Sequence, residues 1–327
     1  MRDFGVEVIR DQSKILLPTP RVNRTVAKLI RTRNIETVAF GAAAPLGWMS
    51  SALRRAGAKR IVALTHGHEV WWSKVFPFNL IMRRIGKTTD SLTYLGEFTG
   101  TAIARALSRK SAESMVKIAP GINTDHFKPL DSKDLRKSLG LEHKKVIVSV
   151  GRLVHRKGQD FLIESMPLIL AQVPDAHLVL IGQGPYLKHL QSLVTKFRLH
   201  ENVSFIDRIQ YQELPRYICA GDIFAMPSRS RFAGLEVEGL GIVYLEASAC
   251  GLPVVAGASG GAPDAVIESV TGYVVEGTDT QQISKRIIEL LLDEELRKKM
   301  GDAGRQWIIK DWRWEIWAAK FAKLLAG

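Results

Sequence analysis

Residues 146–158 read VIVSVGRLVHRKG, and this stretch decides the fold class. Val146–Val150 is a short β-rich run, Gly151 ends it with a turn, and a helical run follows over Phe161–Val173. A glycine turn between a strand and a helix lets backbone N–H groups approach an anion, and the helix N-terminus adds partial positive charge. The spacing is not GxxxxGK[ST], so it does not indicate a Walker A loop.

The same alternation of β-rich and helical runs extends in both directions and predicts parallel sheets built from βαβ units. The other expected strands are Thr37–Phe40, Ile61–Leu64, Ser91–Leu95, Met115–Ile118, Leu178–Ile181, Val203–Ile206, Ile223–Met226 and Val254–Ala256. We predict an α/β protein with two doubly wound, Rossmann-like domains that face a cleft, over residues 1–130 and 131–308. A C-terminal helix over 309–327 is expected to pack back on the first domain.

Length and composition agree with this layout. A single hydrophobic core stops growing near ~250–300 residues, and the chain has 327. Its 46% hydrophobic and 24% charged residues exclude a disordered or fibrous protein. Cys219 and Cys250 are too few for a disulfide framework or a CxxC metal site, and they favour a reduced cytoplasmic compartment. No apolar run reaches the ~18–20 residues that span a bilayer, and Met1–Arg10 does not read as a secretory signal.

The net charge of +13 is concentrated in the first part of the chain. Residues 1–130 hold 21 Lys+Arg and 9 Asp+Glu, a balance of +12, which leaves 25 and 24 for the rest, a balance of +1. Such a half attracts nucleic acid, a phosphorylated substrate or an acidic membrane leaflet, with a preference for solubility as the alternative. Nucleic acid is disfavoured as a partner because no recognisable binding module is present.

Arg152 and Lys157 are the candidate anion ligands of the opening motif. Arginine can bind two phosphate oxygens at once, and lysine supplies a compact charge. Taken alone, the motif is interpreted equally well as a basic turn that faces water.

A second motif, EGLGIVYLE, has seven residues between its two carboxylates, Glu238 and Glu246. Glu246 is expected on a helix that begins near Gly241, and Glu238 in the loop before it. The helix N-terminus can receive an anion, with a carboxylate at either end. Carboxylates accept hydrogen bonds from vicinal hydroxyls, so a sugar and a ribose are natural ligands. The alternative is that Glu238 only lies near the helix dipole and that Glu246 is an exposed helix residue.

Two more segments follow expected strands. Gly257–Asp264, GASGGAPD, either contacts a ligand or makes a tight connection that needs positive φ. Thr65–Glu69, THGHE, lies at the carboxyl end of Ile61–Leu64, where a doubly wound domain exposes its reactive groups. A hydrogen-bonding or polarising histidine is expected there rather than a metal ligand, since neither a second cluster nor a D-x-D triplet accompanies it.

Val70–Lys87, VWWSKVFPFNLIMRRIGK, combines aromatic and basic side chains, as suits the headgroup region of an anionic bilayer. An ordinary helix that packs its apolar face on the sheet is the alternative. The candidate membrane and acceptor residues are Trp71, Trp72, Lys74, Phe76, Phe78, Arg83 and Arg84.

The motifs that carry a family resemblance are GRLVHRKGQD, VEGLGIVYLEA, SGGAPD, APGINTDHFKP, FGAAAPL, DIFAMP and THGHEV. Together they resemble the retaining glycosyltransferases of family four, which have the two-domain GT-B fold. The likeness runs from Val6 to the C-terminus, and it is greatest to the GDP-mannose-dependent mannosyltransferases of actinobacteria that act on phosphatidylinositol mannosides. It implies an enzyme that moves mannose from GDP-mannose to a glycolipid acceptor, without a metal or other cofactor. It also implies a peripheral protein on the cytoplasmic face of the plasma membrane, with an anionic membrane surface as a partner.

The resemblance implies roles for the charged residues. Arg152 and Lys157 would hold the donor diphosphate and neutralise the leaving group. Glu238 would bind hydroxyls of the transferred sugar, and Glu246 the ribose. His66 would sit over the sugar near the reacting carbon, which makes His66, Arg152, Lys157 and Glu238 the expected catalytic residues.

The resemblance also implies backbone contacts and a mechanism. Leu240, Gly241 and Ile242 would face sugar and phosphate, and Ile209 falls where the family's base-contacting loop lies. His68 is the weaker of the two histidine candidates. No residue stands out as a nucleophile, so the family expectation is a front-face retaining mechanism in which the donor phosphate assists the acceptor hydroxyl.

The beginning of the chain departs from the family pattern. Family members usually open with a strand and a glycine-rich loop near the donor phosphates, whereas this sequence begins MRDFGVEVIRDQSKILLPTP. We therefore expect the N-terminal domain to lack its first strand and that loop. Ser230–Gly234, SRFAG, is also less glycine-rich than expected, and Phe232 changes how this loop closes. Two alternatives stay open: a GT-B transferase with another nucleotide sugar or a soluble acceptor, and a truncated relative that binds nucleotide without catalysis.

Overall fold

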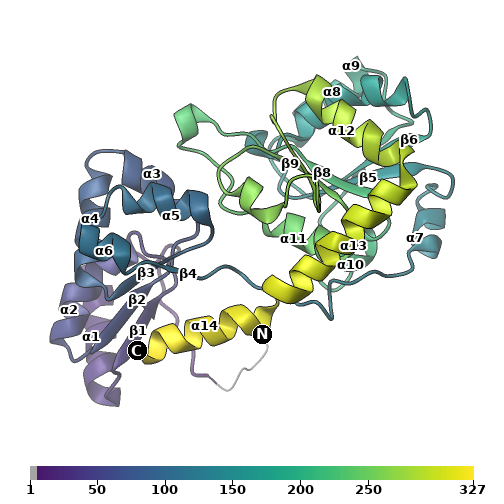
Figure 1. Ribbon diagram of the computed structural model, residues 1–327. Helices are drawn as coiled ribbons and strands as arrows, with labels where there is room; N and C mark the ends of the chain where they lie inside the picture. Colours follow the sequence, from purple (N-terminus) through teal and green to yellow (C-terminus); the bar gives the residue numbers. More distant parts are fainter. Residues whose placement is uncertain (1–5) are drawn as a thin grey trace. The chain divides into compact units, whose positions relative to one another are not determined.

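The computed structural model describes residues 6–327, which divide into two compact units (Figure 1). Unit 1 contains the described part of Met1–Tyr94 together with Ala102–Val116 and Ala322–Gly327. Unit 2 contains Leu95–Thr101 and Lys117–Phe321. Each unit is built on a sheet of short strands with helices between them, as the alternating pattern predicts.

The sheet of unit 1 has four strands that lie side by side in chain order, and the pairs β1–β2 and β2–β3 are parallel. They are β1 (Thr37–Phe40), β2 (Arg60–Ala63), β3 (Ser91–Tyr94) and β4 (Val116–Lys117). The helices along this part of the chain are α1 (Pro20–Arg33), η1 (Leu46–Met49), α2 (Ser50–Arg55), α3 (Glu69–Lys74), α4 (Phe78–Thr88), α5 (Glu97–Ala104) and α6 (Arg109–Glu113). Among the described residues no strand precedes β1, which is therefore an edge strand.

The sheet of unit 2 has six parallel strands in the order β10-β9-β8-β5-β6-β7. They are β5 (Lys145–Val150), β6 (Ala176–Ile181), β7 (Val203–Ile206), β8 (Ile223–Met226), β9 (Val254–Gly257) and β10 (Gly272–Val275). The chain enters at β5, runs outward to β7 and returns to the other side of β5 through β8. This reversal is the topological switch point of a doubly wound sheet, where ligands bind at the carboxyl ends of the strands.

The strands of this second sheet are buried on both sides because helices cover both of its faces. Alternate residues of a strand enter two different cores: Val146 and Val148 face one, and Ile147 faces the other. The elements of this part are α7 (Lys133–Ser138), η2 (His155–Lys157), α8 (Gln159–Leu170), α9 (Leu187–Lys196), α10 (Leu214–Ile218), η3 (Phe232–Gly234), α11 (Ile242–Ala249), η4 (Ala262–Ala265), α12 (Thr280–Leu292), α13 (Glu294–Asp311) and α14 (Trp314–Ala326).

Sequence and structure differ at two places. Val70–Lys87 forms two helices, α3 and α4, because Pro77 between them has no N–H to continue a helical ladder. The strand β10 at a sheet edge was not predicted, although Gly272–Val275 reads GYVV, a β-rich run as long as most of the predicted strands. Along residues 6–327, no helix has both the length and the apolar character needed to cross a membrane.

Gly158, which caps the turn after β5, lies where two backbone segments of unit 2 approach each other closely. Its φ is +73°, and a Cβ there would overlap the carbonyl oxygen of Pro227. Gly140 has a nearly identical φ of +69° with open space around it. We predict that Gly140→Ala lowers the free energy of unfolding by about 1 kcal/mol through backbone strain alone, and that Gly158→Ala lowers it by at least ~2 kcal/mol more through the overlap. Urea denaturation measures both variants, and equal losses would contradict the close approach.

Candidate functional site

The candidate site lies at the carboxyl edge of the second sheet. Val150, Ile181 and Ile206 are in register, so the segments that follow β5, β6 and β7 leave the sheet side by side. The turn after β5 and the segment after β8 flank the switch point between these two strands. Most of the chemistry predicted from the sequence is carried by these segments.

The turn after β5 brings cations to this edge. Lys157 ends the short helix η2 and is only 8% exposed. Arg152 is exposed and forms no ion pair with any described residue, although Gln159 donates a hydrogen bond to its backbone carbonyl (3.3 Å). The guanidinium of Arg152 is therefore available to an incoming anion, as the sequence suggests.

Glu238 accepts hydrogen bonds from two of these cations. Its Oε2 lies 2.8 Å from Lys157 Nζ and 2.5 Å from Arg156 Nη1. Burial lowers the pKa of Lys157, and the charge of Glu238 opposes that shift. Arg156 and Lys157 thus share one carboxylate, which leaves one positive charge in excess, and the unpaired Arg152 in the same turn adds a second. Positive charge at this edge suits a diphosphate.

Arg156 is the member of this group that sequence reasoning missed. It lies within the quoted motif GRLVHRKG, so the signal was present. Only the geometry of η2 shows that two consecutive basic residues, and not Lys157 alone, reach the same carboxylate oxygen.

The loop Gly257–Asp264 holds the Glu238 segment in place. Ser259 Oγ accepts a hydrogen bond from Glu238 N (3.2 Å), and Gly261 N donates to Glu238 O (2.8 Å). Gly260 has a φ of +56°, and a Cβ there would overlap Glu238 O. Of the two interpretations of this loop, the tight connection with positive φ is present.

The helix α11 begins at this same segment. Gly241 caps it with a φ of +78°, and a Cβ there would overlap the ring of Tyr244. Tyr244 is fully buried and donates to Met226 O (2.7 Å), which fixes the first turn of α11 against the end of β8. The first N–H groups of a helix have no acceptor within it, so those that follow Leu240 and Gly241, at Ile242 and beyond, suit an anion.

Glu246 lies on α11 and is only 9% exposed, so the interpretation as an exposed helix residue is wrong. Its carboxylate has no hydrogen-bond or ion-pair partner among residues 6–327. Burial raises the pKa of Glu246 to about 7. An unpartnered, nearly buried carboxylate is suited to accept hydrogen bonds from ligand hydroxyls.

Ile209 and the SRFAG segment complete the loops of this edge. Ile209 is half-buried in the loop after β7 and packs on the core that includes Leu240 and Tyr244. Phe232 is exposed with a φ of +51°, and Ala233 has a φ of +52°. Two non-glycine residues therefore hold the left-handed conformation here, where the family pattern is richer in glycine.

In unit 1, His66 follows the carboxyl end of β2 as predicted. Its Nε2 lies 2.5 Å from Gly41 O and donates a hydrogen bond to this carbonyl oxygen. Glu69 is fully buried and accepts from His66 N (2.9 Å), while His68 Nε2 lies 3.2 Å from Ala44 O. Both histidine rings are thus held by backbone carbonyls.

The aromatic and basic residues of α3 and α4 fall into two groups. Trp71, Trp72 and Phe78 form one aromatic cluster with ring centroids 4.9–5.2 Å apart, and Trp72 also packs on the core of unit 1. Phe76, 75% exposed, projects from the turn between the helices. The basic members Lys74, Arg83 and Arg84 are all exposed. Packing accounts for the cluster of Trp71, Trp72 and Phe78, whereas it does not account for exposed Phe76 or for the basic side chains.

Comparison with known proteins agrees with the resemblance seen in the sequence. The family model described as "Glycosyl transferases group 1" matches residues 131–307. The GDP-mannose-dependent alpha-(1-6)-phosphatidylinositol monomannoside mannosyltransferase of Mycolicibacterium smegmatis is 46% identical over 99% of this chain and 85% of its own length. The GDP-mannose-dependent monoacylated alpha-(1-6)-phosphatidylinositol monomannoside mannosyltransferase of Corynebacterium glutamicum is 44% identical, with the same coverage.

Solved structures show the same fold. Anabaena Alr3699/HepE in complex with UDP matches with a TM-score of 0.83 and 21% identity, over 95% of this chain and 84% of that one. Sucrose-phosphate synthase from Thermosynechococcus elongatus matches with a TM-score of 0.78 and 24% identity, over 93% and 76%. At these identities the likeness is one of fold alone.

The raised pKa of Glu246 predicts a pH-dependent loss of stability. Its folded pKa of about 7 lies above the ordinary 4.5, so folding favours the protonated form. The contribution of Glu246 to the free energy of unfolding is therefore fully present at low pH. This free energy falls by about 3 kcal/mol as the pH rises from about 5 to about 8. Glu246→Gln, which cannot ionise, should not show this fall. Urea denaturation across this range measures the difference, and parallel pH profiles for the two proteins would contradict the assignment. Exposed Glu213→Gln is the control.

Proposed function

The chain belongs to the glycosyl transferases group 1 family and has the GT-B fold, and we propose that it transfers mannose from GDP-mannose to a phosphatidylinositol-mannoside type of acceptor. The observation that carries the proposal is the pairing of Arg156 and Lys157 with the single carboxylate of Glu238, with exposed and unpaired Arg152 in the same turn. The similar proteins of Mycolicibacterium and Corynebacterium, named for this donor and this class of acceptor, support it.

The donor is assigned to the carboxyl edge of the second sheet. Arg152 and Lys157 bind the diphosphate, and the backbone N–H groups at the start of α11 contact phosphate and sugar. Glu238 accepts from hydroxyls of the mannose, and Glu246 accepts from the ribose. The loop of Ile209 receives the base.

The chemistry follows from these contacts. As the bond between the mannose C1 and the diphosphate oxygen breaks, negative charge develops on the leaving diphosphate, and Arg152 and Lys157 stabilise it. The acceptor hydroxyl attacks C1 from the same face, and its proton passes to the departing phosphate oxygen, so the configuration is retained. Charge neutralisation by these side chains takes the part that a metal plays elsewhere. His66 keeps its predicted role next to the sugar.

The acceptor side is assigned to unit 1 and to an anionic membrane surface at the cytoplasmic face. Three apolar side chains of unit 1 are exposed: Trp48, Phe76 and Leu80. The basic residues Arg83 and Arg84 follow Leu80 on α4, and the Arg84 guanidinium lies 4.6 Å from the centroid of the Trp48 ring. Apolar side chains that enter the interface, flanked by cations that meet lipid phosphates, are the pattern of peripheral binding.

Arg152→Ala is the sharpest test of the diphosphate assignment, because Arg152 is exposed and has no role in packing. We predict that turnover with GDP-mannose and a phosphatidylinositol-mannoside acceptor falls by about 10²-fold or more in Arg152→Ala and in Lys157→Ala. Exposed Lys188→Ala on α9 removes the same charge and should leave turnover unchanged. Radiolabelled mannose transfer measures this, and circular dichroism checks that each variant is folded.

Three results would contradict the proposal. Wild-type rates in either variant would exclude the diphosphate role. Tight GDP binding by the wild-type protein with no mannose transfer would favour the non-catalytic nucleotide-binding relative, and transfer only from a UDP-sugar would favour the other GT-B alternative.

Membrane binding is tested by Phe76→Ser combined with Leu80→Ser. We predict that sedimentation with anionic vesicles weakens by roughly tenfold or more, because two apolar side chains no longer enter the interface. Leu292→Ser, at an exposed apolar position of unit 2, is the matched control and should bind as wild type. Binding should also fall with added salt. Equal binding to neutral and anionic vesicles would exclude the electrostatic part.

A further inference from the structure

A second cationic site lies in unit 1, on the opposite edge of its sheet from His66. An open cavity of about 630 Å³ is formed by the ends of α2 and α4 and by α6. Thr88 ends α4 just before β3 begins, so the cavity lies at the amino end of that strand. His66 follows the carboxyl end of β2, which is parallel to β3. The cavity is therefore not part of the site described above.

The charges that line the cavity are unbalanced. Arg54, Arg55, Lys87 and Lys110 contribute four cations, and Asp90 is the single carboxylate in the lining. Asp90 is already engaged, since its Oδ2 accepts from Arg54 Nη2 (2.8 Å) and Ile61 N (2.7 Å). Arg55, Lys87 and Lys110 have no ion-pair partner within residues 6–327. Three like charges around one cavity repel each other until an anion enters.

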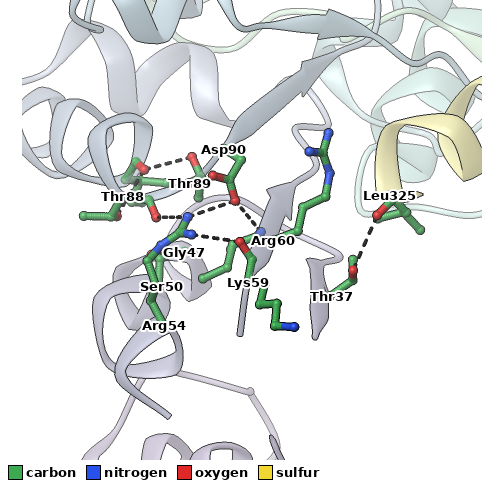
Figure 2. Close-up of polar contacts among 12 residues, drawn as sticks. Thr37, Gly47, Ser50, Arg54, Lys59, Arg60, Thr88, Thr89, Asp90 and Leu325 are labelled. Atoms are coloured by element: carbon green, nitrogen blue, oxygen red, sulfur yellow. Dashed lines mark hydrogen bonds and ion pairs between the residues drawn. The ribbon is translucent and has the colours of Figure 1, made fainter. Parts of the chain in front are cut away.

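The walls of the cavity are braced by the protein itself (Figure 2). Arg54 donates to Lys59 O (3.1 Å) and Thr88 O (3.4 Å) as well as to Asp90, which ties the end of α2 to the end of α4. A Cβ at Gly86 would lie 2.8 Å from Leu107 and 3.3 Å from Ser111 Cβ, so α4 approaches α6 closely. The site is thus preformed.

Apart from Gly86, the rest of the lining consists of serine and threonine residues. Thr88 Oγ1 donates to Arg84 O (3.0 Å) and Ser114 Oγ donates to Ser111 O (2.9 Å), which leaves their oxygen lone pairs free to accept from a ligand. The Ser51 hydroxyl has no partner among the described residues. Cations suit a phosphate, and these hydroxyls suit an alcohol-rich group attached to it.

We propose that this cavity binds a phosphorylated polyol, as a membrane lipid headgroup or as the free phosphate ester, at a second site separate from the transferase centre. Its volume is in the range of small-molecule sites, ~300–1,000 Å³, whereas inorganic phosphate alone would leave most of it to water. Arg55, Lys87 and Lys110 bind the phosphate, and the serine and threonine hydroxyls bind the polyol. Lys87 also continues the exposed basic face of α4 that carries Arg83 and Arg84, so a lipid in the cavity would extend the proposed membrane contact.

The test is Lys87→Gln combined with Lys110→Gln, two exposed positions whose loss leaves the Arg54–Asp90 brace intact. The control, Lys28→Gln combined with Arg31→Gln on α1, removes the same charge from exposed positions elsewhere in unit 1. Calorimetry with myo-inositol 1-phosphate, inorganic phosphate and myo-inositol is done with GDP present to occupy the donor site. We expect inositol phosphate to bind wild type and control alike, more tightly than either fragment, and to bind the cavity variant at least roughly tenfold more weakly.

A vesicle experiment identifies the source of the phosphate. If the natural ligand is a lipid, wild type prefers phosphatidylinositol vesicles to phosphatidylserine vesicles of equal charge, and the cavity variant loses that preference. If the ligand is a soluble ester, only the calorimetric difference is seen. The proposal is overturned if cavity variant and wild type behave alike in both experiments, or if the control weakens binding as much as the cavity variant. Because mannose transfer enters neither measurement, this outcome is distinct from failure of the transferase assignment.

Discussion

A buried carboxylate shared by two cations is the constraint on which the carboxyl edge of the second sheet depends. Glu238 is nearly inaccessible to water, and an unpaired charge at such a position would cost several kcal/mol. Arg156 and Lys157 balance it, and the loop Gly257–Asp264 fixes its backbone through Ser259 and Gly261. The same pairing leaves one positive charge in excess, and Arg152 in the same turn has no ion-pair partner among the described residues.

Close backbone approaches make this arrangement possible. Gly158, Gly241 and Gly260 all have positive φ, and at each a Cβ would overlap a neighbouring group. They bring the turn after β5, the start of α11 and the loop after β9 together at one edge of the sheet. In the same unit, Asp160 pairs with Arg229 (2.6 and 2.7 Å between the paired atoms), and Tyr244 donates a hydrogen bond to Met226 O. Burial opposes ionisation of Asp160, but Arg229 and Tyr186 hold its pKa below the ordinary value.

The positive charge of the first half of the chain serves more than one purpose in the proposals. Part of it lies on α4 beside exposed Phe76 and Leu80, where a membrane surface would meet it. Another part lines the cavity between α2, α4 and α6, where three cations have no partner in the described chain. An excess of positive charge spread over the surface would account for the basic residues of α4. It does not account for the cations of the cavity, because only a concave arrangement directs several cations toward one ligand.

The sequence by itself determined the fold class, nearly all of the strands and the segments of the proposed donor site, because β-rich runs, glycine turns and basic motifs are local patterns. It placed Glu238, Lys157 and Arg152 in neighbouring segments of the site. Only the tertiary structure decided that Arg156 shares Glu238, and that Glu246 is buried without a partner in the described part of the chain. The cavity of unit 1 could not be predicted from the sequence either. Its lining comes from α2, α4 and α6, and burial and ion pairing depend on which distant segments meet, which no local pattern records.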